Sequence, residues 1–126
     1  MNPMFILYVS NQEISASFYK TVLAAEPVLH VPGMTEFKLS EQSSLGLMPY
    51  SGIQQLLSPH LDSTDFDVSQ AKAELYLQVK NANEYLSRAQ EARAKLLSPL
   101  QDRDWGQRVG YCLDLDGHVI AFAEIG

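Results

Sequence analysis

The side chains that could carry acid–base or metal chemistry are few and widely spaced in this chain. Its three histidines are His30, His60 and His118, and imidazole is both a proton carrier near neutral pH and a common metal ligand. No two of them stand at the H-x-x-x-H spacing of a helical metal site, and the single Cys112 excludes a C-x-x-C pair. A Gly-rich phosphate loop with its lysine and a G-x-S-x-G nucleophile elbow are also absent. The sequence therefore contains no established catalytic motif.

The chemistry that remains is that of a ligand-binding surface. Strand alternation places a mixture of apolar, aromatic and polar side chains on one side of the predicted strands: Met4, Ile6, Tyr8, Met48, Glu74, Tyr76, Gln78, Ala121 and Ala123. Such a mixture is typical of a small-molecule pocket. We predict six ligand-binding residues: Tyr8, Met48, Glu74, Tyr76, Trp105 and Tyr111.

Each of these residues also has an ordinary structural interpretation. Trp105 could stack on a flat ring, as could Tyr111, but Trp105 serves equally well as a core or interface anchor. Tyr76 could be a cross-strand packing residue. Glu74 would attract a cationic group if it lay in an apolar groove, and acid–base catalysis by this carboxylate alone is possible in principle. In a wet groove it is simply a solvated carboxylate.

Length and composition limit the class of protein. A chain of 126 residues, 46% of them hydrophobic and 19% charged, fits one compact domain with a real core and argues against disorder. Its net charge of −6 makes a nucleic-acid-binding role unfavourable. No apolar run approaches the length of a membrane span, and no signal-peptide pattern is seen at the N-terminus. The lone Cys112 lies in an apolar strand and is interpreted as a packing residue. A single cysteine cannot form an internal disulfide and fits a reducing compartment, so we expect a cytoplasmic protein.

The first half of the chain predicts the element order β-α-β-β-β. The strand-like run 4–10 leads into Asn11, a helix N-cap, and apolar residues recur at helical spacing to about residue 24. Three short strands follow at about 26–31, 35–39 and 44–48. The segment 50–70 contains several turn-forming residues and is expected to be a crossing loop, although its apolar side chains mean that it is not a bare linker.

The second half repeats this order. A strand at 74–79 leads to a helix at about 82–94, which Asn81 is expected to cap, and strands are predicted at about 96–100, 109–113 and 119–125. The segment Leu77–Asn81 aligns with Leu7–Asn11 at an offset of 70 residues. We therefore predict an α+β fold in which two tandem βαβββ modules form a curved mixed sheet with a groove. The whole chain, 1–126, would be one domain, with module one at about 1–49 and module two at about 71–126.

The last part of the chain carries the most specific pattern. Trp105-Gly106-Gln107-Arg108 leads into Asp114-Leu115-Asp116-Gly117-His118 and a final apolar strand, which indicates a hairpin with a tight turn. In this turn we expect His118 to face solvent. The hairpin and the duplication together resemble the vicinal-oxygen-chelate superfamily, which includes glyoxalases, extradiol dioxygenases and bleomycin-resistance proteins. Leu115 stands where that pattern commonly has proline, a departure that leaves the turn intact.

The resemblance also indicates where a metal would be held. In the metal-using families, ligands lie on the first and last strands of each module, and these positions fall on Met4, Gly46, Glu74 and Ala121. A divalent ion acting as a Lewis acid needs several carboxylate or imidazole donors, and only Glu74 is one. Gly46 and Ala121 are then understood as space left for a ligand. The sequence accordingly predicts no cofactor and no bound metal.

The metal-free bleomycin-resistance proteins resemble the chain best. This resemblance implies a homodimer that sequesters a drug or metabolite, with a planar or cationic small molecule as its ligand and neither nucleic acid nor membrane as a partner. The first alternative is a metal-dependent lyase or dioxygenase of the same fold. A second alternative is a domain without a small ligand that acts in protein association through an exposed sheet.

Overall fold

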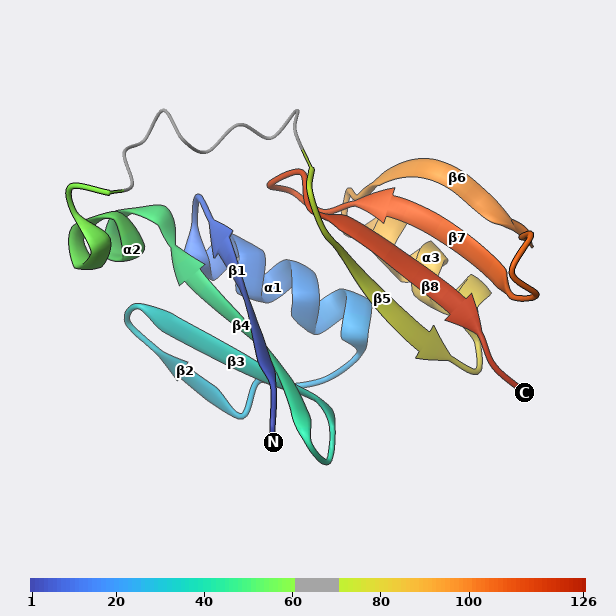
Figure 1. Ribbon diagram of the computed structural model, residues 1–126, viewed down its shortest axis with the longest axis horizontal. Coiled ribbons are helices and arrows are strands. Elements are labelled where there is room, and N and C mark those ends of the chain that lie inside the picture. The colour runs from blue at the N-terminus through green and yellow to red at the C-terminus, as the bar shows by residue number, and fades with distance from the viewer. Residues whose placement is uncertain (61–70) are drawn as a thin grey trace. The chain divides into compact units, whose positions relative to one another are not determined.

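The computed structural model describes residues 1–60 and 71–126. They form two four-stranded mixed sheets with three helices, in the order β-α-β-β-β-α and then β-α-β-β-β (Figure 1). The chain divides into two compact units. One unit contains Met1–Lys20 and the rest of the first half of the chain from Ala24 onward. The other contains the short segment Thr21–Leu23 and the second half of the chain, which ends at Gly126. The predicted α+β fold of two tandem modules is confirmed.

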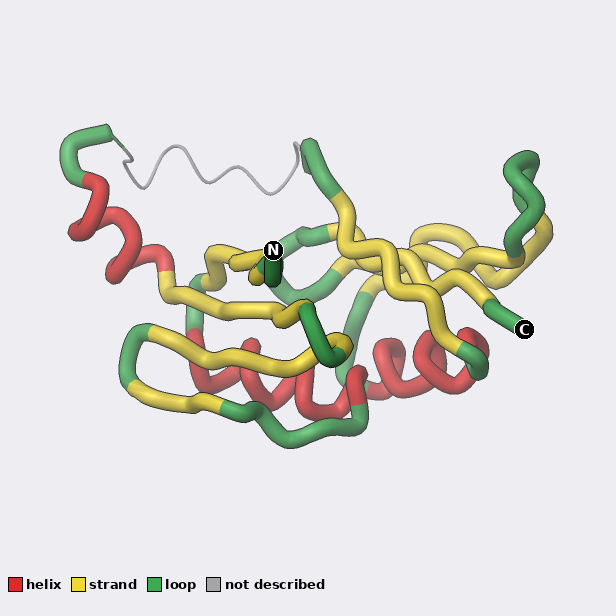
Figure 2. Tube along the Cα trace, turned by 60° about the horizontal axis from the view of Figure 1, so that its bottom comes forward, coloured by secondary structure: helices red, strands yellow, loops and turns green. Residues whose placement is uncertain are grey.

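Module one contains a sheet in the strand order β1-β4-β3-β2. β1 (Met4–Val9) is parallel to β4 (Ser43–Pro49), whereas β3 (Met34–Ser40) is antiparallel to β4 and to β2 (Leu29–Val31). Helix α1 (Gln12–Leu23) runs along one face of this sheet (Figure 2). Phe37, Leu45 and Leu47 on that face are fully buried, as are Tyr19 and Val22 of the helix. Burial of these apolar side chains drives the formation of this core.

Module two repeats the arrangement with the strand order β5-β8-β7-β6. β5 (Glu74–Val79) is parallel to β8 (Val119–Glu124), and β7 (Arg108–Leu113) is antiparallel to β8 and to β6 (Lys95–Asp102). Helix α3 (Ala82–Glu91) packs on one face of this sheet, where the Tyr85 and Phe122 rings lie 5.4 Å apart. The opposite sheet face is therefore the one available for function.

The starts of α1 and α3 are satisfied in different ways. The side-chain oxygen of Asn11 accepts a hydrogen bond from the backbone N–H of Ile14 at 3.0 Å, as expected of an N-cap. Asn81 occupies the N-cap position of α3 but makes no such side-chain bond, so the prediction that it caps the helix is wrong. The carboxylate of Glu124 in β8 accepts the Ala82 N–H at 2.9 Å in its place. The side-chain cap of α3 therefore comes from Glu124, 42 positions away from Ala82, and not from the adjacent Asn81.

The segment expected to be a crossing loop begins as a helix. α2 (Tyr50–Leu57) follows β4 directly, and its Ile53 is buried. The apolar residues Ile53 and Leu56 stand one helical turn apart, a period that the turn-forming residues around them obscured. The later part of the predicted loop, 61–70, lies outside the described residues. No helix in the described ranges is long and apolar enough to cross a membrane.

Candidate functional site

The face of module two that lies away from α3 gathers most of the predicted ligand-binding residues. Glu74, Tyr76 and Gln78 alternate along β5 and are paired in register with Val119, Ala121 and Ala123 of β8. Tyr111 of β7 is paired with Ala121 from the other side, so all of these side chains project from one surface. We call this surface the module-two face; it consists of Glu74, Tyr76, Gln78, Tyr111, Ala121, Ala123 and the turn residues Arg103, Trp105 and Gln107.

A chain of hydrogen bonds crosses the module-two face from the turn between β6 and β7. The indole Nε1 of Trp105 donates to the Tyr76 hydroxyl at 3.0 Å, and that hydroxyl donates to Oε1 of Gln107. Gln107 Nε2 in turn donates to Oε1 of Gln78 at 3.1 Å. Gly106, at φ +91°, gives the turn a backbone conformation that residues with a Cβ rarely adopt. The turn thus brings Trp105 and Gln107 over β5.

Tyr111 lies in the interior of this face. The Arg103 guanidinium lies 5.2 Å from the centre of its ring and is fixed there by donating to the Val109 carbonyl and the Ser98 hydroxyl. Burial raises the pKa of the Tyr111 hydroxyl, with a smaller contribution in the same direction from the Glu74 carboxylate, while Arg103 opposes the shift. Tyr111 therefore presents a neutral hydroxyl across the physiological pH range.

The small residues beneath this face are covered by their neighbours. Val109, Ala121 and Ala123 are fully buried, and Tyr76 and Tyr111 pack against them. Ala121 had been predicted to leave space for a ligand, and that prediction is wrong in this structure because the two tyrosines fill the space above it. A ligand on this face would contact the aromatic side chains and not the strand beneath them.

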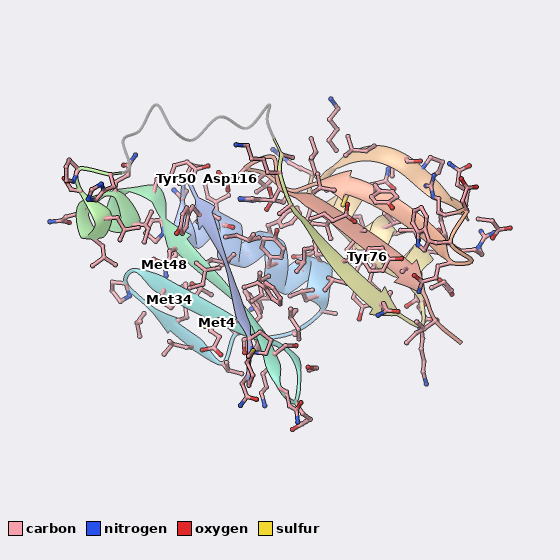
Figure 3. The ribbon with its side chains drawn as sticks, in the orientation of Figure 1. Met4, Met34, Met48, Tyr50, Tyr76 and Asp116 are labelled. Atoms are coloured by element: carbon pink, nitrogen blue, oxygen red, sulfur yellow. The ribbon has the colours of Figure 1, made fainter. Side chains whose placement is uncertain are left out.

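The equivalent surface of module one is apolar and rich in methionine. Tyr8 and Met48 are direct partners in the β1–β4 register, and Figure 3 shows Met4, Met34 and Met48 along the same sheet. A Cβ placed on Gly46 would lie 2.7 Å from the terminal methyl of Met4 and 3.4 Å from the Met34 sulfur. The prediction that Gly46 leaves space for a ligand is therefore wrong as well, since methionine side chains already occupy that space.

The structure thus groups the six predicted residues by module. Glu74, Tyr76, Trp105 and Tyr111 lie together on the module-two face, whereas Tyr8 and Met48 lie together on the sheet of module one. The sequence reasoning did not select Gln107 or Arg103. Gln107 belongs to the run Trp105–Arg108 that was quoted for the closing hairpin, whereas Arg103 lies just before it, so proximity to Trp105 was the only available indication.

Two of the four positions that the family resemblance assigned to metal ligands, Gly46 and Ala121, occupy equivalent places in the two sheets. Ile6 is paired with Gly46 just as Tyr76 is paired with Ala121, which confirms that the two small residues correspond. Among them and the first-strand residues Met4 and Glu74, only Glu74 has a donor that suits a divalent ion. Within residues 1–60 and 71–126, no three His, Cys, Asp or Glu side chains lie close enough to hold a metal. The donor set at these positions does not fit a divalent metal.

The side chains of His118 and His30 contact other polar side chains. His118, which was predicted to face solvent, is half-buried: its Nδ1 lies 2.8 Å from the buried carboxylate of Asp114, which also accepts the backbone N–H groups of Asp116 and His118. His30 lies between the Thr35 hydroxyl at 2.7 Å and the Glu13 carboxylate at 3.0 Å. His60 is described only by its backbone N–H, which donates to the Leu57 carbonyl.

Two open cavities lie away from these faces, near the first turns of α3 and α1. One, of about 660 Å³, is lined by Asn81, Asn83, Glu84, Pro99, Leu100, Arg108 and Glu124. The other, of about 440 Å³, is lined by Ser10, Asn11, Gln12, Glu13, His30, Val31, Pro32, Gly33 and Pro49. Neither includes a predicted ligand-binding residue, and the groups within them are engaged in capping and in the His30–Glu13 contact, so we regard both as structural.

Solved structures with the same architecture share little sequence with this chain. A glyoxalase-related enzyme from Fulvimarina pelagi is 22% identical, with a TM-score of 0.81 over 99% of this chain and 88% of its own. A glyoxalase/bleomycin resistance protein/dioxygenase family enzyme from Burkholderia phytofirmans PsJN is 14% identical, with a TM-score of 0.81 over 98% of this chain and 97% of its own. A glyoxalase/bleomycin resistance protein from Catenulispora acidiphila is 22% identical, with a TM-score of 0.68 over 100% and 99%. These likenesses establish the fold.

Family membership comes from the sequence itself. No curated protein sequence matches the chain significantly. The family model of the glyoxalase-like domain, in contrast, matches residues 3–125, which is almost the entire chain. The duplicated βαβββ modules, the closing hairpin and this match agree with one another. The chain belongs to the glyoxalase-like domain family.

Proposed function

We propose that this protein is a metal-independent small-molecule-binding protein of the bleomycin-resistance type, which sequesters a drug or metabolite. The observation that carries the proposal is the set of residues at the four metal positions. Gly46 and Ala121 have no donor atoms, Met4 offers a soft thioether, and the Met4 methyl lies against Gly46. The remaining carboxylate, Glu74, could not hold a catalytic ion by itself.

The module-two face supports a planar or cationic ligand. Trp105 is 56% exposed, so much of its indole is available for stacking. Tyr76 and Tyr111 supply aromatic edges with polar tips, and the exposed carboxylate of Glu74 lies at one end of β5. Aromatic rings beside a carboxylate attract organic cations through both cation–π and charge interactions.

We further propose that the protein acts as a homodimer in the cytoplasm, with the ligand held in a groove of the dimer. Exposed apolar residues on β1 and β2, including Phe5, Leu29 and Val31, are compatible with an association surface. Light scattering coupled to size-exclusion chromatography at several concentrations tests this part directly. A mass of one chain at all concentrations would exclude the homodimer.

The alternative function is that of a metal-dependent lyase or dioxygenase. The Fulvimarina pelagi neighbour is called a glyoxalase-related enzyme, and this fold accommodates such chemistry in related proteins. Metal content separates the two functions, because a metalloenzyme of this fold requires near-stoichiometric ion, whereas a sequestering protein does not.

The first experiment is elemental analysis of the purified protein after incubation with nickel, zinc, manganese and iron(II) and removal of the excess. We expect well below one ion per chain, and the same content in a Glu74→Gln variant. A panel of planar cationic compounds should then raise the thermal midpoint of the metal-free protein, since a ligand that binds the native state stabilises it. Stoichiometric metal that is lost in Glu74→Gln would favour the enzyme.

A further inference from the structure

The order of donors and acceptors along the module-two face is fixed by one residue that cannot accept a hydrogen bond. The indole N–H of Trp105 is only a donor, so the Tyr76 oxygen must accept from it. The Tyr76 proton then points to its other partner, which must present a carbonyl, and that partner is Gln107. With its oxygen committed, Gln107 turns its amide nitrogen to the Gln78 oxygen.

The chain of bonds therefore ends in a donor. Gln78 is exposed, and with its oxygen accepting from Gln107 its Nε2 group is directed outward. No hydrogen bond from this Nε2 is found within the described part of the chain. A ligand meets an amide donor at this end of β5, and the order of the preceding bonds prevents the amide from offering its oxygen instead.

The other end of β5 has the opposite character. Glu74 is exposed and forms no ion pair with any residue in the described ranges. Because a strand rises about 3.3 Å per residue, Glu74 and Gln78 are separated by about 13 Å along β5, with Tyr76 midway on the same side. The face thus presents a carboxylate, then aromatic rings, then an amide donor.

We propose that Gln107 is a positioning residue that orients Tyr76 and Gln78, so that the module-two face selects elongated ligands with a cationic group at the Glu74 end and a hydrogen-bond acceptor, such as a carbonyl, at the Gln78 end. This inference rests on the proposed small-molecule-binding function and specifies its ligand class. Gln107 acts through its two neighbours: without it, the Tyr76 hydroxyl would keep its bond from Trp105 but lose the acceptor of its proton, and the Gln78 oxygen would lose its donor.

The ligand class is tested with a matched pair of probes, N-benzoylglycyl-L-arginine amide and its citrulline analogue, in which a neutral ureido group replaces the guanidinium. Both carry the same backbone carbonyl acceptors, and they differ only at the side-chain tip, where a neutral ureido carbonyl replaces a charged guanidinium N–H group. Calorimetric titration of the full protein should give about a fivefold preference for the arginine probe, the size expected of an exposed ion pair with a cation–π contribution. Glu74→Gln should remove this preference while leaving the citrulline probe unaffected.

The positioning role is tested by a double-mutant cycle. Gln107→Leu and Tyr76→Phe should each weaken both probes by about fivefold, a typical effect of losing one hydrogen bond. Their combination should lose little more than Gln107→Leu alone, because removal of Gln107 already leaves both the Tyr76 hydroxyl and the Gln78 amide without their shared partner. Gln90→Leu, at an exposed position of α3, is the matched control and should bind like the original protein. If Gln107→Leu fails to fold, Gln107→Glu replaces it: the carboxylate still accepts from Tyr76 but cannot donate to Gln78.

The outcomes separate this inference from the proposed function. Equal binding of the two probes would overturn the ligand class. Full additivity of the two substitutions would overturn the positioning role. Either result would leave small-molecule binding intact. If neither probe binds, this inference falls, and the independent panel of planar compounds then decides whether the protein binds small molecules at all.

Discussion

Leu86 of α3 lies directly over Gly110 of β7, so closely that any side chain on Gly110 would overlap its Cδ1 atom. A Cβ placed on Gly110 would also lie 3.2 Å from the backbone nitrogen of Leu100 in β6. The position is therefore enclosed by a buried side chain and by backbone. Gly46, in module one, is crowded instead by the flexible end of Met4. Two glycines in equivalent sheets are thus confined by groups of very different rigidity.

These surroundings predict different costs for the same substitution. Gly110→Ala should lower the free energy of unfolding by about 1–3 kcal/mol, because overpacking a rigid core displaces its neighbours. Gly46→Ala should cost less than about 1 kcal/mol, since the Met4 side chain can move away. Urea unfolding followed by circular dichroism measures both. Equal costs would contradict this account of the two sites.

Removal of the Asp114 carboxylate should destabilise the closing hairpin. This buried group accepts the N–H groups of Asp116 and His118 at 2.9 and 2.8 Å and contacts the His118 ring. Asp114→Ala leaves those donors unsatisfied and should lower the free energy of unfolding by about 2–3 kcal/mol. His118→Ala removes only the ring contact, and a cost as large as that of Asp114→Ala would show that the ring, and not the backbone, is the important partner.

Substitution of Trp105 should affect binding and spare the fold. Its side chain is more than half exposed, so Trp105→Ala should leave the urea midpoint almost unchanged while weakening planar ligands by about 1–3 kcal/mol. Tyr76→Ala is expected to do both, because this ring also packs on Val109 and Ala121. Comparison of the two variants by calorimetry and unfolding distinguishes a binding residue from one that also supports the core.

Stability should decline in alkaline solution in a way that depends on Cys112. Burial raises the pKa of this thiol from 9.0 to about 11, and Asp114 adds to the shift. The folded state thus favours the protonated thiol, so its contribution is intact below pH 9 and is lost as the pH rises toward 11. The loss amounts to at most about 3 kcal/mol. The difference between original and Cys112→Ala unfolding free energies should be flat below pH 9 and change above it.

Much of the fold could be predicted because the local patterns agree with it. β5 was predicted at its observed bounds, and α1 begins beside its Asn11 cap. The helix ends were less accurate, since α3 ends at Glu91 and the prediction continued to 94. Ala24 and Arg93 adopt the left-handed conformation, with φ of 52° and 76°, at places where glycine usually marks the end of a helix. Without glycine the sequence gives no clear stopping point.

The candidate site was predicted in part for a related reason. Strand alternation assigned Glu74 and Tyr76 to one face. Tyr111 was proposed only as a ring that could stack, and its pairing with Ala121 in the structure is what places it on the same face. Alternation cannot reveal what a turn does, and Gln107 reaches Tyr76 only because the turn folds over β5. It also cannot show that a glycine is already covered, as Gly46 is by Met4, because the reach of a flexible side chain is not encoded in strand spacing.

The parallel pairing of the edge strands β1 and β5 has a consequence for how the protein is made. Met4 pairs with Ser44, and Glu74 pairs with Val119, so each of these edge strands waits for 40 to 45 further residues to leave the ribosome. Such distant pairing is slow relative to the formation of a hairpin or a helix. The β3–β4 and β7–β8 hairpins can form first and serve as templates. Because β4 ends at Pro49 and β5 begins at Glu74, every strand of the first sheet leaves the ribosome before β5 does and can find its partners first.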